Sequence, residues 1–156
     1  MIFVTIGTHN VGFERLVIKM DEIAGLIDEE VVIQIGSTQY KPKHAEYFDF
    51  CDENGILEYL KQARVVVTHA GAGSVLNSLS FVKRIILFPR LKKHGECFDD
   101  QQLELTRVLS ESGQVIAVYD AKDLESAIRS VDTVVPTRLA KNRDLVSFLK
   151  KQFVGT

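Results

Sequence analysis

The sequence predicts a single α/β domain built on a doubly wound, parallel β-sheet, and three observations lead to this fold class. The chain has 156 residues, 46% of them hydrophobic, which is enough for one full core. Short apolar runs rich in β-branched residues alternate with segments of helical period. Runs such as IFVTI, VVIQI and RVVVT are almost continuously apolar, as strands are when helices cover both faces of their sheet.

Six strands are expected along the chain. In order, they are Ile2–Ile6, Val31–Ile35, a short strand at Tyr47–Phe50, Arg64–Thr68, Arg84–Phe88 and Gln114–Val118. A helix is expected from about Asp52 to Gln62, because acidic residues at its start complement the positive end of the helix dipole. Another helix is expected to begin near Gln101, directly after two aspartates.

The last segment, residues 137–153, predicts a basic amphipathic helix. Its apolar stripe of Leu145, Val146, Leu149 and Phe153 is flanked by arginines and lysines. Such a helix closes the domain's own core, docks on another protein or lies on an anionic membrane face, and the sequence leaves these alternatives open. Because no linker or internal repeat is visible, one domain is expected to span residues 1–156.

Composition argues against several classes of protein. With 19 basic and 21 acidic residues, the net charge of −2 gives no electrostatic reason to expect a nucleic-acid partner. Cys51 and Cys97 lie far apart, as free thiols do in a reducing compartment. No apolar run approaches the roughly 20 residues that cross a bilayer, so a cytoplasmic protein is expected. The four histidines lack the spacing of metal ligands, and neither a metal nor another cofactor is expected.

Ligands of doubly wound sheets bind just outside the carboxyl ends of the strands. Three stretches follow strands at that edge: GTHNVGFERL, HAGAGSVLNSL and PRLKKHGECFDDQQLEL. In the third, the basic run from Arg90 to His94 is either a solvated loop or part of a site. The adjacent Gln101 and Gln102, at a helix start, can read hydroxyl groups through paired donor and acceptor contacts.

HAGAGS predicts an anion-binding cradle. Gly71 and Gly73 remove side chains at a helix N-terminus, where free N–H groups and the helix dipole attract negative charge. Ser74 can cap the helix and offer its hydroxyl. The alternative is that the glycines serve only close packing of helix on sheet. His69, before the loop, is either a hydrogen-bonded structural group or a donor to phosphate or sugar.

Other nucleotide and hydrolase motifs are incomplete. Gly7 and Gly12 are spaced as in a P-loop, but Phe13-Glu14 stands where Lys-Ser/Thr is needed. That loop is either an ordinary tight turn or a donor of N–H groups to phosphate. The G-x-G-x-x-G fingerprint of NAD and FAD sites is absent from it. Ser74 lacks the flanking glycines of a nucleophile elbow, which disfavours a hydrolase.

Taken together, FVTIGT, HAGAGS, FPRLKKHGE and DDQQLEL resemble the C-terminal domain of glycosyltransferase family 28 over nearly the whole chain. The likeness is greatest to free-standing donor-binding subunits: the cytosolic half of the two-part GlcNAc transferase of dolichol-linked oligosaccharide synthesis, and bacterial exopolysaccharide galactosyltransferase subunits. The resemblance implies one Rossmann-like half of a GT-B enzyme that holds a UDP-sugar. The other half would be a separate, membrane-associated subunit that binds the acceptor.

The resemblance also implies the residues that bind the donor. They are Gly7, Thr8, His69, Ala70, Gly71, Ala72, Gly73, Ser74, Asn77, Gln101 and Gln102. The HAGAGS residues match the diphosphate loop of the family, the first pair matches the loop after the first strand, and the two glutamines match the helix start that reads the sugar. Three positions depart from the family. Asn77 replaces a glutamate expected to bind the ribose, Val82-Lys83-Arg84 replaces Gly-Lys-Pro, and Gln101 replaces the histidine of Asp-His-Gln.

The function implied is the donor half of an inverting, metal-independent transferase. It would move a hexose or N-acetylhexosamine from UDP to a lipid-linked acceptor at the cytosolic membrane face, through its partner. The general base is expected on the partner, with His9 as an outside candidate in this chain. The rival hypothesis is a non-catalytic nucleotide-sugar-binding or regulatory module, which Asn77 and the missing acceptor half would both permit.

Overall fold

A computed structural model of the chain describes residues 1–81 and 84–133, together with Ser147 and Lys151. The amphipathic helix predicted at 137–153 lies, but for those two residues, outside the described part. So do Val82 and Lys83, two of the three residues that replace the family's Gly-Lys-Pro.

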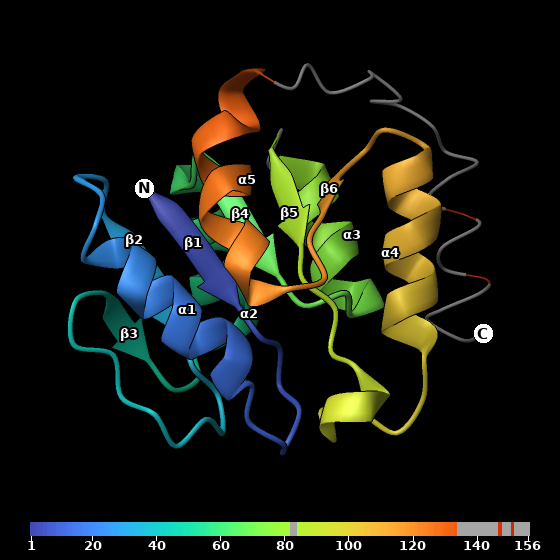
Figure 1. Ribbon diagram of the computed structural model, residues 1–156, viewed down its shortest axis with the longest axis horizontal. Coiled ribbons are helices and arrows are strands. Elements are labelled where there is room, and N and C mark those ends of the chain that lie inside the picture. Colours follow the sequence, from blue (N-terminus) through green and yellow to red (C-terminus); the bar gives the residue numbers. More distant parts are fainter. Residues whose placement is uncertain (82–83, 134–146, 148–150, 152–156) are drawn as a thin grey trace.

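All six strands lie in one parallel sheet in the order β3-β2-β1-β4-β5-β6 (Figure 1). They are β1 (Ile2–Thr5), β2 (Val31–Gln34), β3 (Glu46–Phe48), β4 (Val65–Thr68), β5 (Ile85–Leu87) and β6 (Ile116–Ala117). The doubly wound parallel sheet predicted from the apolar runs is therefore confirmed. This order is that of the Rossmann type, with its reversal between β1 and β4.

Two strands differ in extent from the prediction. The strand expected at Tyr47–Phe50 is formed at Glu46–Phe48. The strand expected at Gln114–Val118 shrinks to two residues, Ile116–Ala117, because it lies at the edge of the sheet and pairs only with β5. Its apolar neighbours are buried all the same and pack into the core beside it.

Helices cover both faces of the sheet (Figure 1). They are α1 (Glu14–Ala24), α2 (Glu53–Gln62), α3 (Ala72–Phe81), α4 (Gln101–Glu111) and α5 (Leu124–Ser130). One buried cluster joins the sheet to α1 and α5, and the other joins it to α2, α3 and α4. Strand residues alternate between these clusters, Val4 facing the first and Phe3 the second, which explains why the strands are apolar throughout.

Local signals in the sequence place two helix starts where they were predicted. The carboxylate of Asp52 accepts the backbone N–H of Gly55 at 2.8 Å, so α2 begins with a side-chain cap. Helix α4 begins at Gln101, as predicted. The described residues contain no helix that is both long enough and apolar enough to cross a membrane.

The amino-terminal ends of the strands are tied together by ion pairs. Arg64, just before β4, donates to Glu29 at 2.5 and 2.9 Å and to Asp132 at 2.9 Å. These bonds lower the pKa of Glu29 to about 2, against the opposing effect of its partial burial. This cluster lies at the end of the sheet opposite the loops that follow the strands.

The chain reverses its winding between β1 and β4. After β1 it passes into α1 on one face, and after β4 it passes into α3 on the other. The two loops therefore diverge from neighbouring strands at their carboxyl ends, the place where sheets of this type bind ligands in a crevice. The loop after β1 and the turn after β5 both lie at the lower end of the sheet in Figure 1.

Candidate functional site

The predicted loops after β1 and β4 lie next to each other, because the two strands are neighbours in the sheet. Thr5 and Thr68 are in register at the ends of β1 and β4, and the Thr5 carbonyl accepts the backbone N–H of His69 at 3.3 Å. Gly7 has a φ of +75°, a left-handed conformation that favours glycine. The side-chain amide of Gln34, on β2, donates to the Gly7 carbonyl at 3.0 Å and helps to hold this turn.

The ring of His69 packs between Gly7 and Gly71. A Cβ atom added to Gly7 would lie 2.6 Å from Nε2 of His69, and one added to Gly71 would lie 2.3 Å from the same atom. Both distances are too short for any side chain. Packing against the histidine ring therefore accounts for Gly7 and Gly71, whereas the alternative expected for Gly71 was packing of the helix on the sheet.

Gly73 serves a different purpose. No heavy atom of the described residues lies within 4 Å of the place that a Cβ at Gly73 would take, and the residue is exposed. The Gly71 carbonyl accepts the N–H of Val75 at 2.9 Å, so the N–H groups of Ala72, Gly73 and Ser74 form the open first turn of α3. Packing therefore does not explain this glycine, and its contact with a ligand stays a prediction.

The other predicted residues at and before the start of α3 divide between the core and the open face. Ala70 and Val75 are buried in the second core cluster, so Ala70 offers its backbone rather than its side chain. Asn77 lies four residues after Gly73 and three after Ser74, on the same face of the helix. The predicted contacts Gly73, Ser74 and Asn77 thus share one surface.

His69 is neutral at physiological pH. Burial lowers its pKa to about 4, with a further contribution from the charge of Arg90, while a hydrogen bond to the Thr5 carbonyl opposes the shift. Nδ1 lies 3.3 Å from the Thr68 hydroxyl, which itself donates to the His69 carbonyl. Because that hydroxyl hydrogen is already used, the contact fits the tautomer protonated at Nδ1, in which Nε2, next to the two glycines, is an acceptor. With Nε2 as an acceptor, the ring can accept a hydrogen bond from a hydroxyl group, but it has no hydrogen to offer a phosphate oxygen.

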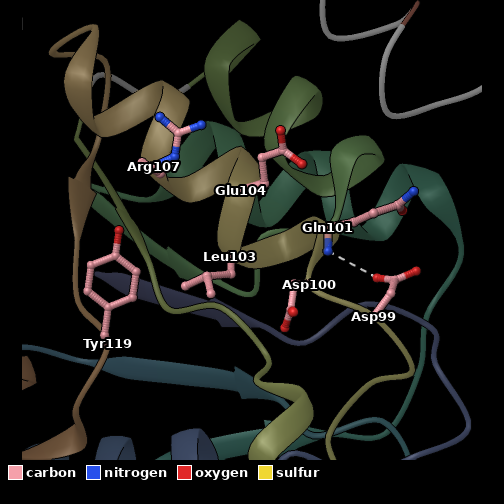
Figure 2. A pocket seen from close by; sticks show the side chains of 7 residues that line it. All are labelled: Asp99, Asp100, Gln101, Leu103, Glu104, Arg107 and Tyr119. Atoms are coloured by element: carbon pink, nitrogen blue, oxygen red, sulfur yellow. Dashed lines mark hydrogen bonds between the residues drawn. The ribbon is translucent and has the colours of Figure 1, made fainter.

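The two predicted glutamines differ in their surroundings. The side-chain oxygen of Gln102 accepts the backbone N–H of Arg90 at 3.0 Å, which ties the start of α4 to the loop after β5. Gln101 is exposed, and its backbone N–H donates to the Asp99 carboxylate at 3.0 Å (dashed in Figure 2). Gln102 therefore has a structural bond, and only its amide nitrogen remains to meet a ligand.

A hollow of about 640 Å³ lies beside α4 and was not foreseen from the sequence (Figure 2). Its lining residues are Asp99, Asp100, Gln101, Leu103, Glu104, Arg107 and Tyr119. Of the predicted donor contacts it includes only Gln101. Three carboxylates against one arginine make it a poor place for a diphosphate, so the crevice between β1 and β4 remains the better candidate site.

His9 lies in the loop after β1. Its Nδ1 accepts the backbone N–H of Val11 at 3.1 Å, and its ring lies 6.1 Å from that of Phe98, which is 84% exposed. Because Nδ1 is an acceptor, the neutral ring carries its proton on Nε2. The free nitrogen is therefore a proton donor, which argues against His9 as the general base. Its neighbour Thr8 is exposed at the rim of the crevice.

Sequence reasoning missed the part played by Arg90 and Glu96. In the sequence the basic run from Arg90 to His94 forms one unit, but in the structure Arg90 is separated from the other basic residues by its burial. Arg90 is 1% exposed, whereas Lys92, Lys93 and His94 form an exposed 3-10 turn. Glu96 is also buried, and both of its carboxylate oxygens bond to Arg15. The only signal in the sequence was the place of Arg90, two residues beyond an apolar strand.

Comparison with known proteins identifies the family. The model of the glycosyltransferase family 28 C-terminal domain matches residues 1–152. The chain belongs to this family. Subunit ALG13 of the UDP-N-acetylglucosamine transferase of Candida glabrata is 25% identical over 136 residues, which are 85% of this chain and 65% of that protein. This chain thus spans about two thirds of the length of that curated relative.

Solved structures support the same fold. A solution structure of ALG13 aligns with a TM-score of 0.65 at 18% identity, covering 99% of this chain and 96% of that one. MurG from Acinetobacter baumannii aligns with a TM-score of 0.61 at 13% identity, covering 95% of this chain but 49% of MurG. The chain therefore has the fold of the C-terminal half of a GT-B glycosyltransferase, as the resemblance implied.

The two HAGAGS glycines should respond oppositely to alanine. Gly71→Ala forces a Cβ against the His69 ring and should lower the free energy of unfolding by about 1–3 kcal/mol, the usual cost of overpacking. Gly73→Ala adds a methyl group in open space within a helix and should leave stability unchanged or raise it by up to about 1 kcal/mol. Urea unfolding measures both. Equal losses in the two variants would show that the surroundings of Gly73 are not open.

Burial of neutral His69 should make stability depend on pH. Because its folded-state pKa, about 4, lies below the unfolded value of 6.5, stability is complete above pH 6.5. It falls as the pH drops toward 4, where only the unfolded chain takes up the proton, by on the order of 3 kcal/mol. His69→Gln should flatten the decline between pH 6.5 and 5, whereas His94→Gln, at an exposed position, should not. Urea midpoints against pH decide; an unchanged slope in His69→Gln contradicts the assignment.

Proposed function

We propose that this chain is the donor-binding subunit of an inverting, metal-independent UDP-sugar glycosyltransferase. It holds the UDP-sugar, a UDP-hexose or UDP-N-acetylhexosamine, in the crevice between β1 and β4. A membrane-associated partner supplies the acceptor-binding half and presents a lipid-linked glycan acceptor. The complex works at the cytosolic face of a membrane, to which this chain is recruited by the partner.

The open first turn of α3 is the observation that carries this proposal. Its N–H groups, the positive end of the helix dipole and the empty space at Gly73 favour a diphosphate at this point. As the bond from sugar to UDP breaks, negative charge grows on the leaving diphosphate. Fixed N–H donors stabilise that charge without having to reorganise, which lowers the barrier to transfer.

The nucleotide and the sugar would be read by side chains at either end of the crevice. Asn77, one turn along α3, lies where its side-chain oxygen can accept a hydrogen bond from a ribose hydroxyl. Gln101 and the amide nitrogen of Gln102 are available to the sugar hydroxyls at the start of α4. Thr8 would contribute from the rim of the first loop.

The acceptor site and the general base are assigned to the partner. This chain aligns with 49% of MurG, and the relative from Candida glabrata is named a subunit of its transferase. One Rossmann-like unit offers one face of a GT-B cleft. The proton of the acceptor hydroxyl must be removed from the opposite side of the sugar ring, because inversion requires in-line attack.

A second candidate function is a nucleotide-sugar-binding or regulatory module without transferase activity. Asn77 favours it, because an amide binds a ribose hydroxyl without the extra strength of a charged carboxylate. A weaker donor site would suit a sensor of nucleotide-sugar concentration.

Ligand binding to the crevice tests the donor assignment. UDP should raise the melting temperature in proportion to ln(1 + [UDP]/Kd), and UMP should raise it less. Gly73→Val should abolish the effect while the protein stays folded, because the new side chain occupies the phosphate position. Asn77→Glu should preserve or tighten UDP binding. Protection by ATP or NAD but not by UDP would refute the assignment, and much weaker UDP binding by Asn77→Glu would place the ribose elsewhere.

Activity should require two subunits. The purified chain is expected to transfer no sugar from a radiolabelled UDP-sugar to a lipid-linked acceptor, because the proposal assigns acceptor binding to the partner. Adding membranes that contain the partner should restore transfer, and Gly73→Val should stay inactive in the same assay. Full activity of the isolated chain would overturn the two-subunit hypothesis. UDP binding with no activity in any membrane fraction would favour the non-catalytic module.

A further inference from the structure

Arg90 lies beneath the candidate site and fastens its first loop. Its guanidinium donates to the carbonyls of Gly12 at 3.0 Å, Glu96 at 3.3 Å and Ile6 at 3.3 Å. Ile6 and Gly12 stand at the two ends of the loop that follows β1. One side chain, reaching across from the loop after β5, thus fixes both ends of a loop that lines the crevice.

The charge of Arg90 has no direct counter-ion. None of the ion pairs found in the described part of the chain involves Arg90, and its Nε is buried without a hydrogen-bond partner. The nearby carboxylate of Glu96 is already engaged, because Arg15 binds both of its oxygens at 3.0 and 3.1 Å and the Leu91 N–H donates to one of them. Arg90, Arg15 and Glu96 together carry a net charge of +1, and Glu14 is the other carboxylate that acts on Arg90, at a distance and without an ion pair.

Burying such a charge is unfavourable unless something compensates for it. Three carbonyl oxygens and the ring of Phe13, 4.8 Å from the guanidinium carbon, compensate in part. The pKa of Arg90 is nevertheless lowered, chiefly by burial and against the opposing effects of Glu96 and Glu14. The positive potential also reaches His69 in the crevice, where it helps to keep that ring neutral. A bound anion in the crevice would complete the compensation.

We propose that Arg90 is a positioning residue for the donor diphosphate. It holds the loop from Gly7 to Gly12 in the shape that borders the crevice, and its charge, which no direct ion pair neutralises, attracts the diphosphate from behind the loop. This inference rests on the proposed function and adds a residue to it. The buried cation and the α3 N-terminus act from two sides on one anion, without any charged side chain that must itself touch the ligand.

The fork of arginine is needed at this position. A lysine keeps the charge, but its single ammonium group cannot reach three carbonyls that lie in different directions. Methionine fills a similar volume and removes both the charge and the donors. Arg90→Lys therefore separates charge from loop geometry, and Arg90→Met removes the two together.

Three variants and three ligands test the proposal. Arg90→Met and Arg90→Lys are compared with Arg64→Met, which removes an arginine that is ion-paired at the opposite end of the sheet. Calorimetry gives the affinities of UDP, uridine and inorganic pyrophosphate. Arg90→Met should lose about 10- to 100-fold in UDP affinity, as is typical when a residue that orients a binding group is removed, with uridine affinity nearly unchanged. Arg90→Lys should lose less, and Arg64→Met should lose stability but no UDP affinity.

The pKa of His69, followed by NMR, gives a readout without ligand. It should rise in Arg90→Met, because a positive charge has been removed from its surroundings, and should stay near its original value in Arg90→Lys; His9 is the other titratable group acting on this ring. If Arg90→Met does not fold, the ratio of UDP to uridine affinity in Arg90→Lys carries the test.

The outcomes distinguish a failure of the role proposed for Arg90 from a failure of the donor assignment. Equal losses for UDP and uridine would mean that Arg90 only supports the fold, and unchanged UDP affinity in a folded Arg90→Met would mean that its charge does not reach the ligand. Either result overturns the role of Arg90 and leaves the donor assignment standing. A wild-type chain that binds pyrophosphate but not UDP, with pyrophosphate lost in Arg90→Met, overturns the donor assignment and supports Arg90. Binding of neither ligand overturns both.

Discussion

The packing of the His69 ring between Gly7 and Gly71 is the contact on which the candidate site depends. It joins the loops of two neighbouring strands at the point where the winding of the sheet reverses. Any side chain at either glycine would collide with the ring. The histidine thereby fixes where α3 begins, and with it the direction in which the first N–H groups of that helix point.

The electrostatics of the crevice follow from this packing. A buried histidine stays neutral, so positive potential has to come from groups that do not occupy the ligand space. The α3 dipole supplies it from one side, and the buried guanidinium of Arg90 supplies it from behind the first loop. The hollow on α4, with its three carboxylates, has the opposite character. Charge thus separates the α4 hollow from the region around the start of α3.

Much of this arrangement could be predicted from the sequence. Uninterrupted apolar runs determined a sheet covered on both faces, and HAGAGS marked a helix start with free N–H groups. The division of labour between the glycines could not be predicted, because it depends on where the His69 ring turns in three dimensions. The burial of Arg90 was equally hidden, since its partners Ile6 and Gly12 lie about 80 residues earlier in the chain. The bond from Gln102 to the Arg90 backbone is a third feature of this kind.

The central claim is that UDP binds at the reversal of the sheet, between the loops of β1 and β4. The most direct measurement is a map of backbone amide chemical shifts in a ¹⁵N-labelled chain titrated with UDP. Large shifts are expected at Gly7, Thr8 and the residues from Gly71 to Ser74, with little change at Arg107, Tyr119 or Arg64. Shifts confined to the α4 hollow, with Gly71 to Ser74 unmoved at saturating UDP, would contradict the placement of the donor site.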